Sequence, residues 1–141
     1  MNRKLERKLI FIGAIWEFIT GVATIFFYAS MIKKDGLSVK ETSFAKVEAI
    51  QSVFGSMYMF AVSFGMLFIA LGLINIFVAK SLKDDEVSIK KPIWLFFIGL
   101  ASYFMMDILG SLMFLSAGIL ALAKNKSIVK LSELELQKTV L

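Results

Sequence analysis

Glu17 is the residue of this 141-residue chain whose setting most strongly suggests chemistry. It is the only charged residue in the stretch 9–32, which is long enough to cross a bilayer as a helix. At a rise of about 1.5 Å per residue it lies on the order of 12 Å beyond Lys8. A carboxyl group at that depth needs a partner, a proton or a water-filled cavity. Two interpretations stay open: a site for a proton, a cation or a partner's basic group, and a neutral glutamic acid hydrogen-bonded inside the protein.

The expected neighbours of Glu17 follow from helical spacing and from depth. Helical periodicity places Thr20 on the same face of the first apolar stretch. Counting about eight residues inward from the same side of each later stretch reaches small and hydroxyl residues at the same level. The sequence therefore predicts an intramembrane polar site that consists of Glu17, Thr20, Ser102, Tyr103 and Ser116.

Asp107 interrupts the apolar stretch 93–123. A single helix over this stretch would be about 46 Å long, well beyond the roughly 30 Å of a hydrocarbon core. One helix and two helices both remain possible by length, and the distribution of basic residues favours two. We therefore predict a break at Asp107, whose carboxylate caps the N-terminus of the following helix.

Several kinds of chemistry are excluded by residue type. The chain has no His and no Cys, which removes disulfides, thiolate chemistry, ordinary zinc sites and imidazole catalysis. It contains no nucleophile–base pattern, no glycine-rich phosphate loop and no cluster of metal ligands. We expect a protein that is not an enzyme and that uses neither a metal nor a cofactor.

The composition indicates lipid as the solvent for much of the surface. Hydrophobic residues make up 58% of the chain and the mean hydropathy is +0.78. We predict a single all-α domain over 1–141, an integral membrane four-helix bundle whose third and fourth spans form a tight antiparallel hairpin. The predicted segments are spans at about 9–32, 52–79, 92–106 and 108–123, an amphipathic segment at about 39–51 and a cytoplasmic tail at 124–141. The amphipathic segment either lies on the membrane or extends the second span, and the tail is either a short helix or disordered.

Small residues mark the expected helix contacts, because they let two backbones approach closely in lipid. They recur at helical spacing in the first two spans, and the predicted packing residues are Gly13, Gly21, Ala61, Gly65 and Gly72.

The basic residues predict the orientation in the membrane. Four spans place three of the four basic clusters on the cytoplasmic side, whereas three spans divide the clusters equally. We expect a multi-pass protein of a bacterial plasma membrane with both termini in the cytoplasm. The net charge of +5 does not indicate nucleic-acid binding, since aromatic and basic residues are not interleaved. The expected partners are the lipid bilayer and either other membrane subunits or further copies of the chain.

Two resemblances add to these expectations. The basic N-terminal tail, the longer first loop and the closing hairpin around Asp107-Ile108-Leu109-Gly110 resemble those of uncharacterised small four-span membrane proteins of Gram-positive bacteria. That resemblance implies a fold and no activity. The segment Gly13–Gly21 is similar to the first helix of the small multidrug resistance exporters, whose membrane-embedded Glu exchanges protons for organic cations in an antiparallel dimer. It implies that Glu17 is a shared proton and substrate site, although the long first loop here departs from that family.

The sequence thus supports two functional hypotheses. The first is a non-catalytic accessory, regulatory or assembly subunit of a larger membrane complex, because packing residues are abundant and catalytic patterns are absent. The alternative is a small proton- or cation-coupled transporter that works as an oligomer, with Glu17 as the carrier site.

Overall fold

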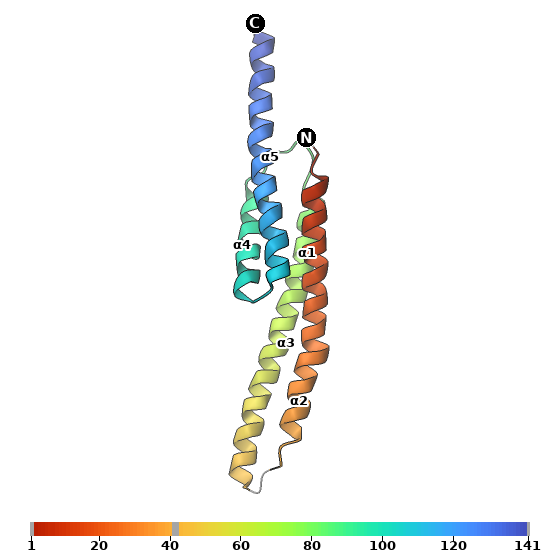
Figure 1. Ribbon diagram of the computed structural model, residues 1–141, viewed down its shortest axis with the longest axis vertical. Coiled ribbons are helices and arrows are strands. Elements are labelled where there is room, and N and C mark those ends of the chain that lie inside the picture. The colour runs from red at the N-terminus through yellow and green to blue at the C-terminus, as the bar shows by residue number, and fades with distance from the viewer. Residues whose placement is uncertain (1, 41–42, 141) are drawn as a thin grey trace. The chain divides into compact units, whose positions relative to one another are not determined.

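The computed structural model describes residues 2–40 and 43–140, and these residues form helices without any β-strand (Figure 1). The prediction of an all-α protein is confirmed. The helical segments in chain order are α1 (Lys4–Ala23), the π-helical η1 (Thr24–Ala29), α2 (Ser30–Leu37), α3 (Phe44–Ser81), α4 (Lys90–Phe104) and α5 (Ile108–Val140). The first three follow one another without a break, so the described residues contain four separate helices.

Three of these helices are long and apolar enough to cross a membrane: Lys4–Leu37, Phe44–Ser81 and Ile108–Lys138. The first has 34 residues and is therefore about 51 Å long. Helix α4 has 15 residues, or about 22 Å, which is shorter than the roughly 30 Å of a hydrocarbon core.

The helices extend beyond the predicted spans at their polar ends. From Phe44 onward the predicted amphipathic segment is the beginning of α3, and residues 41–42 lie outside the described part of the chain. The predicted tail continues α5 as far as Val140. No proline interrupts either extension, and once a helix has formed, each further residue adds one backbone hydrogen bond.

The chain divides into two compact units. The central unit is Glu17–Gly72, and the terminal unit combines Met1–Trp16 with Leu73–Leu141. In the central unit, α1 and α3 meet backbone to backbone, since a Cβ atom added to Gly21 would lie 2.6 Å from the carbonyl oxygen of Gly65. Nearer the loop, a Cβ atom on Gly36 would lie 2.6 Å from Cβ of Phe54. Glycine is required where two helices approach this closely.

In the terminal unit, α5 packs against both α4 and α1. A Cβ atom on Gly99 of α4 would lie 2.7 Å from Cγ of Leu115. A Cβ atom on Gly13 of α1 would lie 3.0 Å from the ring of Phe114, which is fully buried. The other buried apolar side chains of this unit include Ile10, Ala14, Leu95, Ile98, Ala117 and Ala121.

The turn between α4 and α5 covers residues 105–107 (Figure 1). The backbone N–H of Asp107 donates to the carbonyl of Ser102 at 2.9 Å, and that of Met106 donates to Tyr103 at 3.0 Å. This pair of bonds is the Schellman arrangement, which ends a helix with one residue in the left-handed region. Met106 occupies that position with φ 62°, where glycine is usual.

Candidate functional site

A hydrogen bond joins α1 to the start of α5, between two residues that each lie in an apolar stretch of the sequence. Nε1 of Trp16 donates to Oδ1 of Asp107 at 2.9 Å. The same carboxylate oxygen accepts the backbone N–H of Gly110 at 3.0 Å, as an N-cap residue does. Oδ2 of Asp107 is buried without a hydrogen-bond partner among the described residues. Asp107 therefore begins α5 and also holds it to α1.

A second tryptophan makes the same kind of contact between α3 and α4. Nε1 of Trp94 donates to the side-chain oxygen of Asn75 at 3.0 Å. Asn75 is fully buried. An indole N–H that lies next to buried apolar surface needs an acceptor, and the amide of Asn75 provides one.

Arg3 lies just before α1 and is hydrogen-bonded to several other segments of the terminal unit. Its backbone N–H donates to Oδ1 of Asp84 at 2.8 Å. Its guanidinium donates to the carbonyl of Glu86 at 2.8 Å and to the side-chain oxygen of Asn125. The amide of Asn125 in turn donates to the carbonyl of Ser88 at 2.7 Å. These bonds connect the N-terminus, the loop after α3 and the middle of α5.

An ion pair adds to this end of the terminal unit. Nζ of Lys124 lies 2.7 Å from Oε2 of Glu6, and the side chain of Glu6 is fully buried. The pair joins α1 to α5, and loss of Lys124 would leave the buried Glu6 carboxylate without its cation.

Asp84 lies in the loop that follows α3 and is bound by two arginines. The backbone N–H of Arg3 lowers the pKa of the Asp84 carboxyl below its ordinary value, and the guanidinium of Arg7 adds to that shift. Desolvation of Asp84 acts in the opposite direction and is outweighed. Arg7 also donates to the carbonyl of Leu82 at 3.0 Å, which fixes its position beside the loop.

The residues of the predicted intramembrane polar site differ in their exposure. Glu17 is fully buried and has an interaction partner. Ser102 is buried and Thr20 is half-buried. Tyr103 and Ser116 are exposed. Helical geometry explains the contrast between Ser102 and Tyr103, because adjacent residues of one helix point about 100° apart.

The predicted packing residues Gly13, Gly21, Ala61, Gly65 and Gly72 are all buried. The contacts described above show that Gly13 meets Phe114 and that Gly21 meets Gly65.

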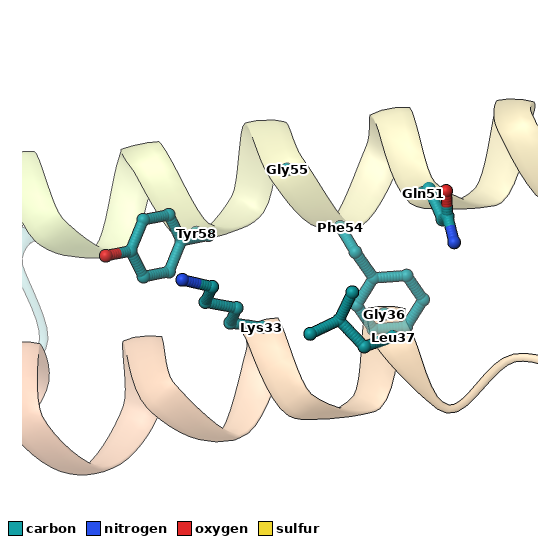
Figure 2. A pocket seen from close by; sticks show the side chains of 7 residues that line it. All are labelled: Lys33, Gly36, Leu37, Gln51, Phe54, Gly55 and Tyr58. Carbon is teal, nitrogen blue, oxygen red and sulfur yellow. The ribbon is translucent and has the colours of Figure 1, made fainter.

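A groove marks the surface of the central unit between α2 and α3 (Figure 2). Its volume is about 220 Å³. The ammonium group of Lys33 lies 5.7 Å from the ring centre of Tyr58, within the range of a cation–π contact. Figure 2 shows Lys33 and Tyr58 at one end of the groove and Gln51 at the other. A Cβ atom on Gly55 would meet no atom within 4 Å, so the groove is open at that position.

Sequence reasoning did not identify Arg3, Trp16 and Trp94 as contact residues. A usable signal was present for the tryptophans, since each carries one N–H donor in an apolar stretch that offers few acceptors. No comparable signal exists for Arg3, because its acceptors come from three distant parts of the chain.

The described residues contain no group of three or more Asp or Glu side chains that could hold a metal ion. No protein-family model, curated protein or solved structure matches the chain.

Proposed function

We propose that this chain is an integral membrane protein that crosses the membrane twice, through Lys4–Leu37 and Phe44–Ser81, and inserts α4 and α5 as a hairpin that turns inside the apolar layer. Both termini then lie on the cytoplasmic side. This arrangement keeps the predicted hairpin and orientation. It has two complete spans instead of the four predicted ones, which would place the Asp107 turn at the outer surface.

The surface of the turn supports this placement. The side chain of Phe104 is 82% exposed and that of Met106 is 88% exposed, and Ile108 beside them is also exposed. A turn in contact with water usually carries polar residues. The backbone N–H groups of residues 105–107 are all hydrogen-bonded within the turn, as hydrocarbon surroundings require.

The length of the helices supports the same placement. Asp107 is hydrogen-bonded to Trp16, which is the thirteenth residue of α1 and lies only about 18 Å along the helix from Lys4. Helix α4 covers only about 22 Å between Lys90 and the turn. A hairpin of this length reaches part of the way across a bilayer.

Single-cysteine labelling tests the arrangement, and the absence of native Cys gives a clean background. Cysteines replace Lys34, Lys83 and Met106 one at a time, and intact cells and inverted vesicles are treated with a membrane-impermeant maleimide. We expect Lys34→Cys to react only from outside, Lys83→Cys only from inside and Met106→Cys from neither side. Labelling of Met106→Cys from outside would replace this arrangement by four complete spans.

Within this arrangement, we propose a non-catalytic role as an accessory, regulatory or assembly subunit of a membrane complex. The observation that carries this proposal is that buried polar side chains of the terminal unit pair with one another. The pairs Glu6–Lys124, Trp16–Asp107 and Asn75–Trp94 each join two segments of the terminal unit. Polar side chains that pair with one another inside the protein stabilise the packing of its helices. The outer surface is then mainly apolar and can contact lipid and other subunits.

Extraction of native membranes into polymer nanodiscs tests this role. We expect the tagged protein to occur in particles heavier than a single chain, with one further membrane polypeptide in fixed stoichiometry. Recovery of the chain alone as a monomer from its native membrane would contradict the role of subunit.

The burial of Glu17 favours a second candidate, a transporter that carries protons or cations. Its side chain is fully buried in a helix that is apolar on both sides of it. In proteoliposomes, Glu17→Gln should then abolish pH-dependent flux of organic cations, whereas Glu48→Gln, an exposed carboxylate of α3, should not. Flux that is equal in Glu17→Gln and in the unmodified protein would eliminate this candidate.

A further inference from the structure

A second groove lies in the terminal unit, at the ends of α1 and α3. Its volume is about 320 Å³, within the range typical of ligand sites. It is lined by Lys4, Arg7, Lys8, Phe11, Ala79 and Lys80.

Four of the six residues that line this groove are basic, and they line it almost entirely with the apolar stems of their side chains. Lys4, Lys8 and Lys80 are exposed, so their ammonium groups are available to a ligand. Arg7 is held in place by the carbonyl of Leu82 and by Asp84, whose oxygen lies 3.2 Å from the guanidinium. No acidic residue lines this groove among the described residues. The four basic residues therefore give the surroundings of the groove a positive charge that attracts an anion.

The remaining part of the groove is apolar. Ala79, which is 3% exposed, and Phe11 complete its lining. On α1 the residues Lys4, Arg7, Lys8 and Phe11 follow at helical spacing, so cations and ring share one face. A ligand that fits this groove must join an anionic group to an apolar one.

The position of the groove identifies the source of such a ligand. Phe11 and Ala79 belong to the apolar stretches of α1 and α3, whereas the basic residues lie at or beyond the ends of these stretches. If these helices cross a membrane, as proposed above, the groove spans the boundary between headgroups and hydrocarbon. Basic pockets between helices at the cytoplasmic surface bind lipid headgroups.

We propose that this groove binds an anionic membrane phospholipid, whose phosphate lies among Lys4, Arg7, Lys8 and Lys80 and whose first acyl carbons lie against Phe11 and Ala79. This inference rests on the proposed membrane insertion. It is independent of the proposed role as an accessory subunit.

Native mass spectrometry tests the site. The protein is reconstituted in bilayers of phosphatidylcholine and phosphatidylglycerol and released into an uncharged detergent, and the retained lipids are counted. We expect retention of phosphatidylglycerol in preference to phosphatidylcholine. The triple variant Lys4→Gln/Lys8→Gln/Lys80→Gln should lower this preference on the order of a hundredfold, because each Lys near an anionic surface contributes to lipid affinity. Arg7 is left unchanged, since its contacts also hold the loop.

Two further variants separate a specific site from diffuse attraction. The triple replacement of the same three lysines by Arg keeps the charge and should retain phosphatidylglycerol. The control Lys90→Gln/Lys126→Gln/Lys130→Gln removes three exposed cations outside this groove and should behave as the unmodified protein does. Equal losses in the two glutamine variants would overturn the proposal.

A competition arm distinguishes a lipid from a soluble phosphate. Glycerol 3-phosphate should not displace the retained phosphatidylglycerol, because it lacks the apolar part of the ligand. Complete displacement by glycerol 3-phosphate would overturn the lipid assignment.

Alkaline extraction of the membranes keeps this test separate from the proposed membrane insertion. A protein that resists alkali and shows no preference for phosphatidylglycerol disproves the lipid site alone, and a protein released by alkali disproves the insertion.

Discussion

Trp16 and Asp107 lie 91 positions apart in the chain and share a hydrogen bond of 2.9 Å. The indole comes from the interior of α1, and the carboxylate comes from the turn that precedes α5. Because Asp107 also caps α5 through Gly110, this contact sets the turn of the α4–α5 hairpin at the level of Trp16, together with the Gly13–Phe114 and Glu6–Lys124 contacts further along α1. The depth proposed for the hairpin depends on these contacts.

Trp16→Phe should destabilise the protein more than Trp94→Phe does. Both changes keep an aromatic ring and remove one indole N–H donor. The first leaves a buried carboxylate oxygen with fewer donors, which we expect to cost about 1–3 kcal/mol, whereas loss of the bond to the Asn75 amide should cost about 0.5–1.5 kcal/mol. Equilibrium unfolding in mixed detergent micelles, followed by circular dichroism, measures both values. The reverse order would contradict the role assigned to the Trp16–Asp107 bond.

Met106→Gly should stabilise the turn between α4 and α5. A residue with a Cβ atom at φ 62° carries a steric cost that glycine avoids. Met106 is 88% exposed, so little packing is lost. After the greater entropy of glycine in the unfolded chain is subtracted, we expect a gain of about 0.5–1 kcal/mol in the free energy of unfolding.

The neighbouring Met105 provides the control for that change. Its φ of −82° is ordinary for any residue, so Met105→Gly should lower the stability. If Met106→Gly also lowered the stability, the left-handed residue would not be a source of strain.

Gly21→Ala should weaken the contact between α1 and α3. The added methyl group would lie 2.6 Å from the carbonyl oxygen of Gly65, and the two backbones must move apart to admit it. We expect a loss of about 1–3 kcal/mol. Gly55→Ala is the matched control, because a Cβ atom there meets nothing within 4 Å and alanine favours the helix by up to about 1 kcal/mol. The difference between the two unfolding free energies measures the effect, and equal values would contradict close packing at Gly21.

Asp84 should make the stability of the terminal unit fall in acid. Its pKa in the folded protein is lowered, above all by the backbone N–H of Arg3, so the ionised form favours folding. That contribution is complete above the pKa of the unfolded chain, and it is lost as the pH falls through the lower pKa of the folded state. The unfolding temperature, measured between neutral and strongly acidic pH, should therefore fall less in Asp84→Asn than in the unmodified protein. Parallel curves for the two proteins would show that Asp84 makes no pH-dependent contribution.

The fold class could be predicted from the sequence with little ambiguity. Long apolar stretches separated by charged segments predict helices, and the lone charge at Asp107 marks the place where one helix ends and another begins. The extension of α3 back to Phe44 and of α5 to Val140 could not be decided. Amphipathic segments of this kind are compatible with a continued helix, a separate surface helix or disorder, and the choice depends on neighbouring turns.

The candidate site could be predicted only in part. The burial of Glu17 and the position of Asp107 at the start of a helix agree with their residue types and spacing. The contacts of Asp107 with Trp16 and of Asn75 with Trp94 depend on the register between helices that are far apart in the chain. A sequence without an alignment carries no information on that register.

The sequence by itself determined that this protein is helical and which segments are apolar, and it favoured a division of the last apolar stretch at Asp107. For α4 and α5, only the tertiary structure decided which face is buried, as the adjacent residues Ser102 and Tyr103 show, since the first is buried and the second is exposed. The physical reason lies in the composition of these helices. A helix that is apolar all round has no hydrophobic face to set its rotation, so close glycine contacts and a few polar pairs determine how it packs.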